Sequence, residues 1–312
     1  MQILDLKDGR QIPTLGLGFM FAEKSKVVET VIAGIKAGFR HIDTAQVYGN
    51  EELIGQGIAK AIELKLVTRE ELFVSGKLWN LHHDPDIVGE KVEETLKKLG
   101  LKYLDLLIIH FPTAFLNTVK SQVSFESKEK FLTYPLEDTW EEMENLVRLN
   151  KVISLGLANF NKKQIMRIIE RCEIEPAVLQ IESSVLFPNQ DLIDFCKTQN
   201  IIAFSWLPFG HPDHEDSKNL FFRKEIVKIA DDMKKTAPQV CLKHCLQRGL
   251  GVIVDSTDPN KLQEYGEVFD FDIDIDDMFE ISNKIIPKRT ADFVELLWGH
   301  AQYPFEDVKV TE

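Results

Sequence analysis

Short hydrophobic segments alternate with longer amphipathic segments along the whole chain. Segments such as LDLLIIH (104–110) are short and rich in branched residues, which is typical of strands buried on both faces. Segments such as LEDTWEEMENLVRLN (136–150) place apolar residues three and four positions apart, as an amphipathic helix does. The pattern predicts eight strands, at residues 14–18, 39–43, 72–77, 104–110, 153–159, 177–182, 201–206 and 251–256.

The regular alternation of strand and helix predicts a parallel sheet covered by helices. Eight such units in roughly 250 residues fit a closed (β/α)8 TIM barrel, and we expect one barrel domain over residues 1–312. An open doubly wound sheet is the alternative fold. That fold usually carries a Gly-x-Gly-x-x-Gly turn after its first strand, whereas this sequence has Phe21 where the third glycine belongs.

Two features outside the eight units predict how the ends of the barrel are covered. Asp8 and Gly9 separate two alternating segments, which favours a β-hairpin that plugs the N-terminal end. Three segments are too long for plain connections, at residues 112–136, 207–221 and 286–312. The first two follow strands four and seven, so they emerge at the C-terminal end of the barrel, where active sites lie. We expect the tail at that end as well.

The composition narrows the class of partner. The chain has 37 Lys and Arg against 50 Asp and Glu, a formal net charge of −13, which repels nucleic acid and anionic lipid. No apolar run reaches about 18 residues, and the N-terminus lacks the features of a secretory signal. The four cysteines are sparse and predict free buried thiols in a reducing compartment. We expect a cytoplasmic protein whose partner is a small molecule, with no nucleic-acid or membrane partner.

Three groups of potential ligands do not predict a metal site. Cys241 and Cys245 are four residues apart, but no second pair with zinc-like spacing accompanies them. The acids of DFDIDID (270–276) alternate as in a calcium loop, yet Ile275 occupies the position that needs glycine. HPDHED (211–216) combines proline with charge, which favours a solvated loop. We therefore expect no metal.

Four polar residues lie where predicted strands end. Asp43 closes the second strand and Tyr48 follows in its loop, while Lys77 closes the third strand and His110 the fourth. Each residue alone has a structural explanation, as a helix cap, an exposed ring, a snorkelling lysine or a hydrogen-bonded core histidine. In a closed barrel, however, the ends of neighbouring strands meet at one rim. We therefore expect these four side chains to lie together.

At these positions the sequence resembles the aldo-keto reductase superfamily. The matching motifs are GFRHIDTAQVYGNE (38–51), VSGKLWN (74–80) and DLLIIHFP (105–112), and the resemblance continues to AQYPF (301–305). It implies a monomeric enzyme that reduces aldehydes or ketones to alcohols by hydride transfer from NAD(P)H. The alternative function is a dinucleotide-binding barrel that has a sensing or structural role and little catalytic turnover.

The resemblance assigns roles that fit elementary acid–base chemistry. An unperturbed phenol has a pKa of about 10 and is a reluctant acid at neutral pH. We expect Tyr48 to be the general acid, with the ammonium of Lys77 lowering its pKa. Asp43 is expected to hold the lysine protonated and oriented. His110 is expected to donate a hydrogen bond to the substrate oxygen or to help shuttle the proton.

The same resemblance predicts how a nicotinamide dinucleotide is held without a Rossmann turn. Asn159 and Gln180 are expected to bind the carboxamide, and the ring of Phe204 is expected to stack on the nicotinamide. Ser205 and Leu207 are expected to line the path of the pyrophosphate.

The segment after the eighth strand departs from the pattern of relatives that prefer NADPH. Asp255 stands where those relatives carry a lysine and Lys261 where they carry an arginine, whereas Ser256 and Glu264 are retained. A carboxylate about 4 Å from a 2′-phosphate would be repelled by about 1 kcal/mol or more. NADP(H) is the family default, and NAD(H) or dual use is the competing hypothesis.

Large apolar side chains are expected to form the substrate pocket. Collectively they predict an apolar funnel with polar chemistry at its base. Aldehydes or ketones of moderate hydrophobicity fit such a funnel, and sugars stay possible because the family reduces them. The predicted pocket residues are Phe19, Met20, Trp79, Phe111, Phe115 and Trp298, with Trp206 as a further candidate.

Overall fold

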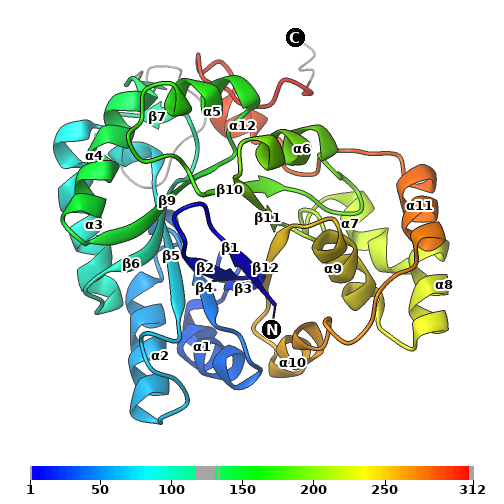
Figure 1. The fold of residues 1–312 in the computed structure, drawn as a ribbon. Helices are drawn as coiled ribbons and strands as arrows, with labels where there is room; N and C mark the ends of the chain where they lie inside the picture. Colours follow the sequence, from blue (N-terminus) through cyan, green and yellow to red (C-terminus); the bar gives the residue numbers. More distant parts are fainter. Residues whose placement is uncertain (1, 117–130, 133, 309–312) are drawn as a thin grey trace.

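Eight parallel strands form a closed barrel in the computed structural model, which describes residues 2–116, 131–132 and 134–308 (Figure 1). The barrel closes where β3 (Leu15–Gly18) pairs with β12 (Gly251–Asp255). All eight predicted strands are present within about two residues at either end, which confirms the (β/α)8 barrel over the open sheet. The other six strands are β4 (His41–Asp43), β5 (Phe73–Leu78), β6 (Leu104–Ile109), β9 (Val152–Ala158), β10 (Val178–Glu182) and β11 (Ile202–Trp206).

Helices surround the barrel because each carries one apolar face. Leu17 of β3, Val31 and Ile54 are fully buried in one large core between the strands and the helices. The helices of this layer are α1 (Val27–Lys36), α2 (Glu51–Glu63), α3 (Pro85–Leu99), α4 (Leu136–Arg148), α5 (Lys162–Ile169), α6 (Gln190–Thr198), α9 (Ala237–Gln247) and α10 (Pro259–Gly266). Further helices are α7 (Glu215–Asn219), α8 (Lys224–Met233), α11 (Ile275–Lys284) and α12 (Val294–Leu297).

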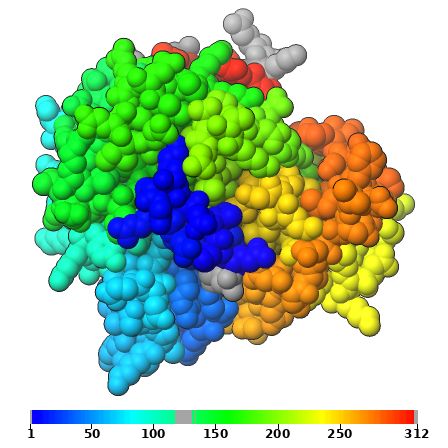
Figure 2. Space-filling view, viewed as in Figure 1, coloured from blue at the N-terminus to red at the C-terminus, as the bar shows by residue number. Residues whose placement is uncertain are grey.

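The predicted hairpin closes the N-terminal end of the barrel. Strands β1 (Ile3–Asp5) and β2 (Gln11–Pro13) pair antiparallel, and Gly9 between them has a φ of +82°. Ile12 is fully buried against the residues that fill the barrel interior, and the hydroxyl of Ser154 donates to Asp8 Oδ2 at 2.5 Å. Figure 2 shows the hairpin, in blue, lying over this end of the molecule.

The long segments gather at the opposite end. After β6, strands β7 (Ala114–Phe115) and β8 (Phe131–Leu132) pair antiparallel, while residues 117–130 and 133 of the predicted loop lie outside the described residues. The tail reaches this hairpin, since the Ala114 N–H donates to His300 Nε2 at 3.3 Å. The segment after β11 meets the tail through a 2.8 Å hydrogen bond from the His211 N–H to the hydroxyl of Thr290. These contacts place all three segments around the C-terminal mouth, with α12 as a short helix within the tail.

The described residues contain no helix with the length and apolar character needed to cross a membrane. They also contain no group of three or more His, Cys, Asp or Glu side chains arranged to hold a metal ion. The cysteines are free, and burial raises the pKa of Cys196 to about 12, which makes a reactive thiolate unfavourable. Two acids of residues 270–276 pair with lysines, Asp270 with Lys235 at 2.6 Å and Asp272 with Lys243 at 2.7 Å.

Candidate active site

The four polar residues predicted from strand ends lie around one small cavity at the C-terminal mouth. Asp43 is the last residue of β4, and Lys77 lies near the end of the neighbouring β5. Tyr48 ends a short 3₁₀ helix, which stops at Gly49 with a φ of +62°. The cavity has a volume of about 20 Å³, and its lining residues are Gly18, Met20, Asp43, Tyr48, Lys77, His110, Ala158, Asn159, Gln180, Trp206, Leu207, Ile253 and Asp255.

The carboxylate of Asp43 is held on both oxygens. Oδ2 accepts a hydrogen bond from Lys77 Nζ, which also donates to the carbonyl oxygen of Thr44 at 3.1 Å. Oδ1 accepts from the hydroxyl of Ser75 at 2.6 Å and from Gln180 Nε2 at 2.9 Å. Both charged groups of the ion pair are buried, so these neutral donors stabilise it where water does not reach.

The phenol of Tyr48 holds its proton more firmly than the sequence suggests. Lys77 Nζ lies 5.3 Å from the centre of its ring. Nevertheless burial, followed by the charges of Asp43 and Asp255, raises the pKa of Tyr48 well above its ordinary value. The pKa of Tyr48 is therefore raised overall rather than lowered as expected, because burial and the two carboxylates outweigh an ammonium that is already paired with Asp43. The phenol keeps its proton, as a general acid must.

The imidazole of His110 faces the phenol edge-on, with the two ring centres 5.9 Å apart. Burial, the charge of Lys77 and the neighbouring His83 lower the pKa of His110 well below its ordinary value. The ring is consequently neutral, and one of its nitrogens carries a hydrogen that a substrate oxygen could accept.

Both predicted carboxamide ligands, Asn159 and Gln180, line the cavity. Asn159 has a φ of +62° and its Nδ2 donates to the carbonyl oxygen of His110 at 3.0 Å, while Gln180 binds Asp43. Leu207 also lines the cavity. Ser205 does not, because its hydroxyl points away and donates to the carbonyl oxygen of Ser183 at 2.5 Å.

Phe204 does not reach the mouth, so its predicted stacking role is wrong. It is fully buried inside the barrel, with its ring centre 5.5 Å from that of His41, and a Cβ added at Gly251 would lie 2.2 Å from it. Trp206, two residues later on the same face of β11, lines the cavity instead. The ring of Phe293 stacks on Trp206 at 5.8 Å and 29°.

Asp255 turns into the mouth from the end of β12. The backbone N–H groups of Phe21 and Met20 face its carboxylate, and a Cβ added at Gly18 would lie 2.8 Å from its Oδ2. Burial, followed by the charge of Asp43, raises the pKa of Asp255 to about 6. The mouth therefore holds, besides Asp43, a carboxyl group whose pKa is raised towards neutrality.

The other three residues of the predicted phosphate site lie outside the cavity. The hydroxyl of Ser256 accepts from the Asp258 N–H at 3.2 Å at the start of α10. Lys261 is exposed on that helix, and Glu264 on the same helix accepts a hydrogen bond from the hydroxyl of Thr236. Only an extended ligand that leaves the mouth towards α10 could meet them.

The predicted substrate residues divide into those that reach the mouth and those that do not. Met20 lines the cavity, and Trp79 packs against His110 with ring centres 5.4 Å apart. Phe111 and Phe115 surround the same indole, at 6.3 and 6.1 Å.

Two of the six are not part of this arrangement. Phe19 is fully buried in the core between barrel and helices, which contradicts its predicted place in the pocket. Trp298 is 44% exposed on the tail, where it packs against Tyr303 at 5.3 Å, and it does not line the cavity.

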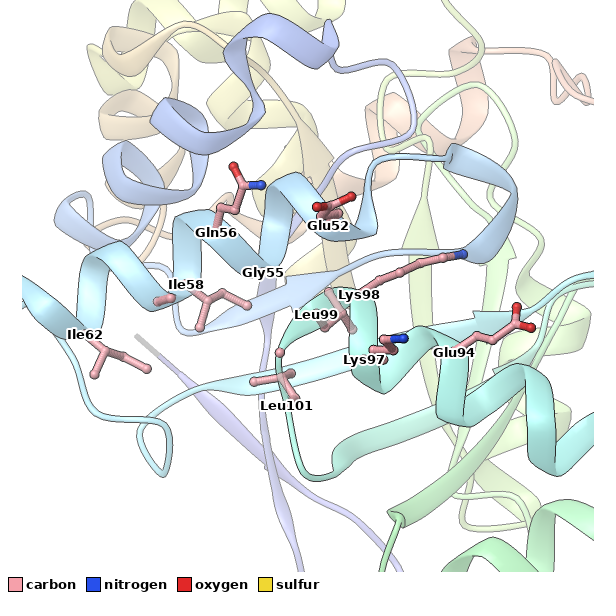
Figure 3. Close-up of a pocket in the computed structure, with 12 residues that line it drawn as sticks. Glu52, Gly55, Gln56, Ile58, Ile62, Glu94, Lys97, Lys98, Leu99 and Leu101 are labelled. Carbon is pink, nitrogen blue, oxygen red and sulfur yellow. The ribbon is translucent and has the colours of Figure 1, made fainter.

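A wider groove of about 860 Å³ lies on the outer surface between α2 and α3 (Figure 3). Its apolar floor includes Ile58, Leu99 and Leu101, and its rim carries Glu52 and Lys98. None of the strand-end residues described above lines it, so it offers no counterpart to the chemistry at the mouth.

Comparison with known proteins gives matches over nearly the whole chain. A model of the Aldo/keto reductase family matches residues 14–286. The NADPH-dependent D-xylose reductase of Meyerozyma guilliermondii is 37% identical over 306 residues, which cover 92% of this chain and 95% of the relative. The NAD(P)H-dependent D-xylose reductase I,II of Candida tropicalis is 34% identical over 309 residues, 93% of this chain and 94% of that one. The solved structure of the aldose reductase from Schistosoma japonicum has a TM-score of 0.93 and 36% identity, covering 98% of this chain and 99% of that chain.

Proposed function

The chain belongs to the aldo/keto reductase family and is an NAD(P)H-dependent oxidoreductase, and we propose that it reduces an aldehyde or ketone with Tyr48 as the general acid. The observation that carries this proposal is the shared cavity of Asp43, Tyr48, Lys77 and His110. A half-buried phenol that keeps its proton, next to a neutral imidazole, is suited to protonating an alkoxide.

The residues of the mouth fit a nicotinamide ring and its carboxamide. Trp206 offers an aromatic surface in the cavity, and its buried Nε1 has no hydrogen-bond partner among the residues that the structure describes. Asn159 and Gln180 supply amide groups in the same cavity. We propose that these three side chains hold the nicotinamide, with Trp206 in the stacking role first assigned to Phe204.

The proposed reaction is an addition of hydride and proton across the carbonyl group. A dihydronicotinamide held by Asn159, Gln180 and Trp206 would supply the hydride. His110 donates a hydrogen bond to the carbonyl oxygen, which polarises it, and Tyr48 transfers its proton to that oxygen as negative charge develops. Lys77, held by Asp43, stabilises the phenolate that is left behind. Trp79 and Phe111 exclude water on the substrate side.

We further propose that the enzyme accepts NADH, alone or together with NADPH. Asp255 places negative charge in the mouth, and Lys261 is the single cation retained at the expected phosphate positions. A lysine supplies a point charge without the bidentate fork of an arginine. The two yeast relatives are an NADPH-dependent and an NAD(P)H-dependent D-xylose reductase. A largely apolar, aromatic wall favours a carbonyl substrate of moderate hydrophobicity.

The proposal is tested by steady-state reduction of a panel of aliphatic, aromatic and sugar aldehydes with each nucleotide. We expect turnover of at least one class, and loss of that turnover in Tyr48→Phe. Nucleotide binding without turnover of any substrate would instead support the alternative, a dinucleotide-binding barrel with a sensing or structural role.

A further inference from the structure

A line of hydrogen bonds runs from the inside of the barrel to Asp43. His41 Nε2 lies 2.9 Å from the hydroxyl oxygen of Ser75, and that hydroxyl lies 2.6 Å from Asp43 Oδ1. His41 and Asp43 are on β4 and Ser75 is opposite Asp43 on β5. All three side chains are almost fully buried, so the line is shielded from water and its geometry is set by the two strands.

The direction of these hydrogen bonds follows from the donors available. A serine hydroxyl has one hydrogen, and a carboxylate can only accept, so Ser75 donates to Asp43 and accepts from His41. His41 therefore carries its hydrogen on Nε2. Burial lowers the pKa of His41 to about 4, so the ring is neutral and Nδ1 is bare. The carbonyl oxygen of Pro13 also faces the ring and raises this pKa, but Nδ1 makes no geometrically defined hydrogen bond within the described ranges.

The ring of His41 is fixed by its surroundings. Phe73 and Phe204 contact it edge-on, at 5.0 and 5.5 Å between ring centres. On the neighbouring strand β3 a Cβ at Gly16 would lie 2.8 Å from Nδ1, so only glycine leaves room for the ring there. The imidazole is thus held with Nε2 aimed at Ser75.

The two donors to Asp43 Oδ1 differ in what a bound nucleotide does to them. Gln180 lines the mouth cavity, and in the proposed function its amide also contacts the nicotinamide. Ser75 lies deeper, bound to His41, and does not line that cavity. Ser75 is therefore the partner of Oδ1 that a nucleotide in the mouth would not contact.

We propose that Ser75, oriented by His41, is a positioning residue. It holds the side chains of Asp43, and hence of Lys77, in a fixed position relative to the phenol of Tyr48 during turnover. The inference rests on the proposed function, because it concerns the proton that Tyr48 delivers. The charged groups that face the phenol are Asp43, Lys77 and Asp255, with the neutral His110 opposite. Loosening Asp43 changes the position of two of these three charges.

The kinetic test compares Ser75→Ala with Ser154→Ala as the matched control. Ser154 is also a buried barrel serine that donates to a carboxylate, but at the opposite end of the barrel. We expect Ser75→Ala to lower kcat about tenfold, the loss expected from one hydrogen bond to a charged group. The KM for nucleotide should stay within about twofold, and the basic limb of the kcat–pH profile should move. Ser75→Thr, which keeps the hydroxyl, should restore most of the rate.

Equal kcat in Ser75→Ala and Ser154→Ala, or no difference between the alanine and threonine variants, would overturn the proposal. If the Ser75 variants do not fold, His41→Gln and His41→Leu provide the same comparison. Glutamine can present an N–H near the place of Nε2, whereas leucine cannot, so His41→Gln should retain more activity.

A second readout does not depend on turnover. Nitrogen-15 chemical shifts of the imidazole, assigned by the loss of signal in His41→Gln, report which nitrogen carries the hydrogen. We expect a neutral ring protonated on Nε2 throughout neutral pH, and a ring protonated on Nδ1 would refute the proposed line of hydrogen bonds. A wild-type protein with no turnover but the expected tautomer would refute the proposed function and leave this geometry standing.

Discussion

Replacing Asp255 by asparagine tests how the end of β12 selects between the two nicotinamide dinucleotides. The variant keeps the shape of the side chain and an acceptor oxygen for the N–H groups of Met20 and Phe21, and it removes the negative charge. Because burial raises the pKa of Asp255 to about 6, the wild-type side chain is mostly ionised at about pH 7 and mostly protonated at about pH 5. At low pH the wild-type enzyme should therefore behave as the variant does.

The charge of Asp255 acts most strongly on the nucleotide that carries a 2′-phosphate. Two unit charges about 8 Å apart at an effective dielectric constant of about 20 repel by about 2 kcal/mol. Salt lowers this to about 1 kcal/mol at physiological ionic strength. About 1–2 kcal/mol corresponds to a factor of about 5 to 30. We expect kcat/KM for NADPH to rise by that factor in Asp255→Asn, while kcat/KM for NADH changes by less than about threefold.

The assay measures initial rates with one aldehyde while NADPH and NADH are varied in turn from about pH 5 to pH 8. The 2′-phosphate is itself a phosphate monoester, which takes up a proton near pH 6. Any pH dependence of the nucleotide preference that persists in Asp255→Asn is therefore caused by the phosphate. The difference in pH dependence between the wild-type enzyme and the variant is caused by Asp255. Lys261→Ala is the matched control, because removing a cation from α10 should move the preference the other way. An unchanged ratio of NADPH to NADH efficiency in Asp255→Asn at neutral pH would refute the reasoning.

Three further predictions concern the acid, the stacking surface and the packing of the helices. Tyr48→Phe should lower kcat about 10²- to 10⁴-fold while the Kd of either nucleotide, from fluorescence titration, is unchanged; full turnover would exclude Tyr48 as the acid. Trp206→Phe should keep the stacking surface but remove most of the nucleotide-dependent quenching of tryptophan fluorescence, and undiminished quenching would argue against stacking at Trp206. Gly55→Ala should lower the free energy of unfolding in urea by about 1–3 kcal/mol, because its Cβ would lie 2.5 Å from the carbonyl oxygen of Leu99. Gly89→Ala is the control, since apart from the neighbouring backbone of its own helix no described atom lies within 4 Å of its added Cβ. This variant should raise the free energy of unfolding by about 0.5–1 kcal/mol, and equal effects of the two variants would contradict the packing argument.

The barrel is predictable from the sequence because its strands are buried on both faces and leave unbroken runs of branched residues, as in β6. The meeting of Asp43, Lys77 and His110 follows from the same topology, since neighbouring parallel strands end at one rim. The place of Tyr48 at the same rim is predicted from the sequence motif around Asp43. The segment 117–130 lies outside the described residues, so its predicted role as a long loop stays a prediction.

Depth within the barrel is harder to predict than the order of its strands. Phe204 and Trp206 share a face of β11, but the sequence does not say which of them reaches the mouth. That depends on the stagger between strands: Phe204 lies opposite Gln180 and Gly251, and its ring fills the space that Gly251 leaves. The prediction that Phe19 lines the substrate pocket is wrong for a related reason. Phe19, the residue after β3, faces the helices, while Gly18 and Met20 face the cavity.

The acidity of Tyr48 shows why a list of charged residues does not determine a pKa. The motif supplies a lysine next to a tyrosine, which alone would favour the phenolate. In the structure Lys77 is paired with Asp43, and Asp255 adds a second carboxylate that faces the same cavity. One ammonium against two carboxylates leaves the mouth net negative while Asp255 is ionised, and burial adds to the cost of a further negative charge on the phenol. The phenol therefore retains its proton until charge develops on a substrate oxygen, which is the behaviour that carbonyl reduction requires of its acid.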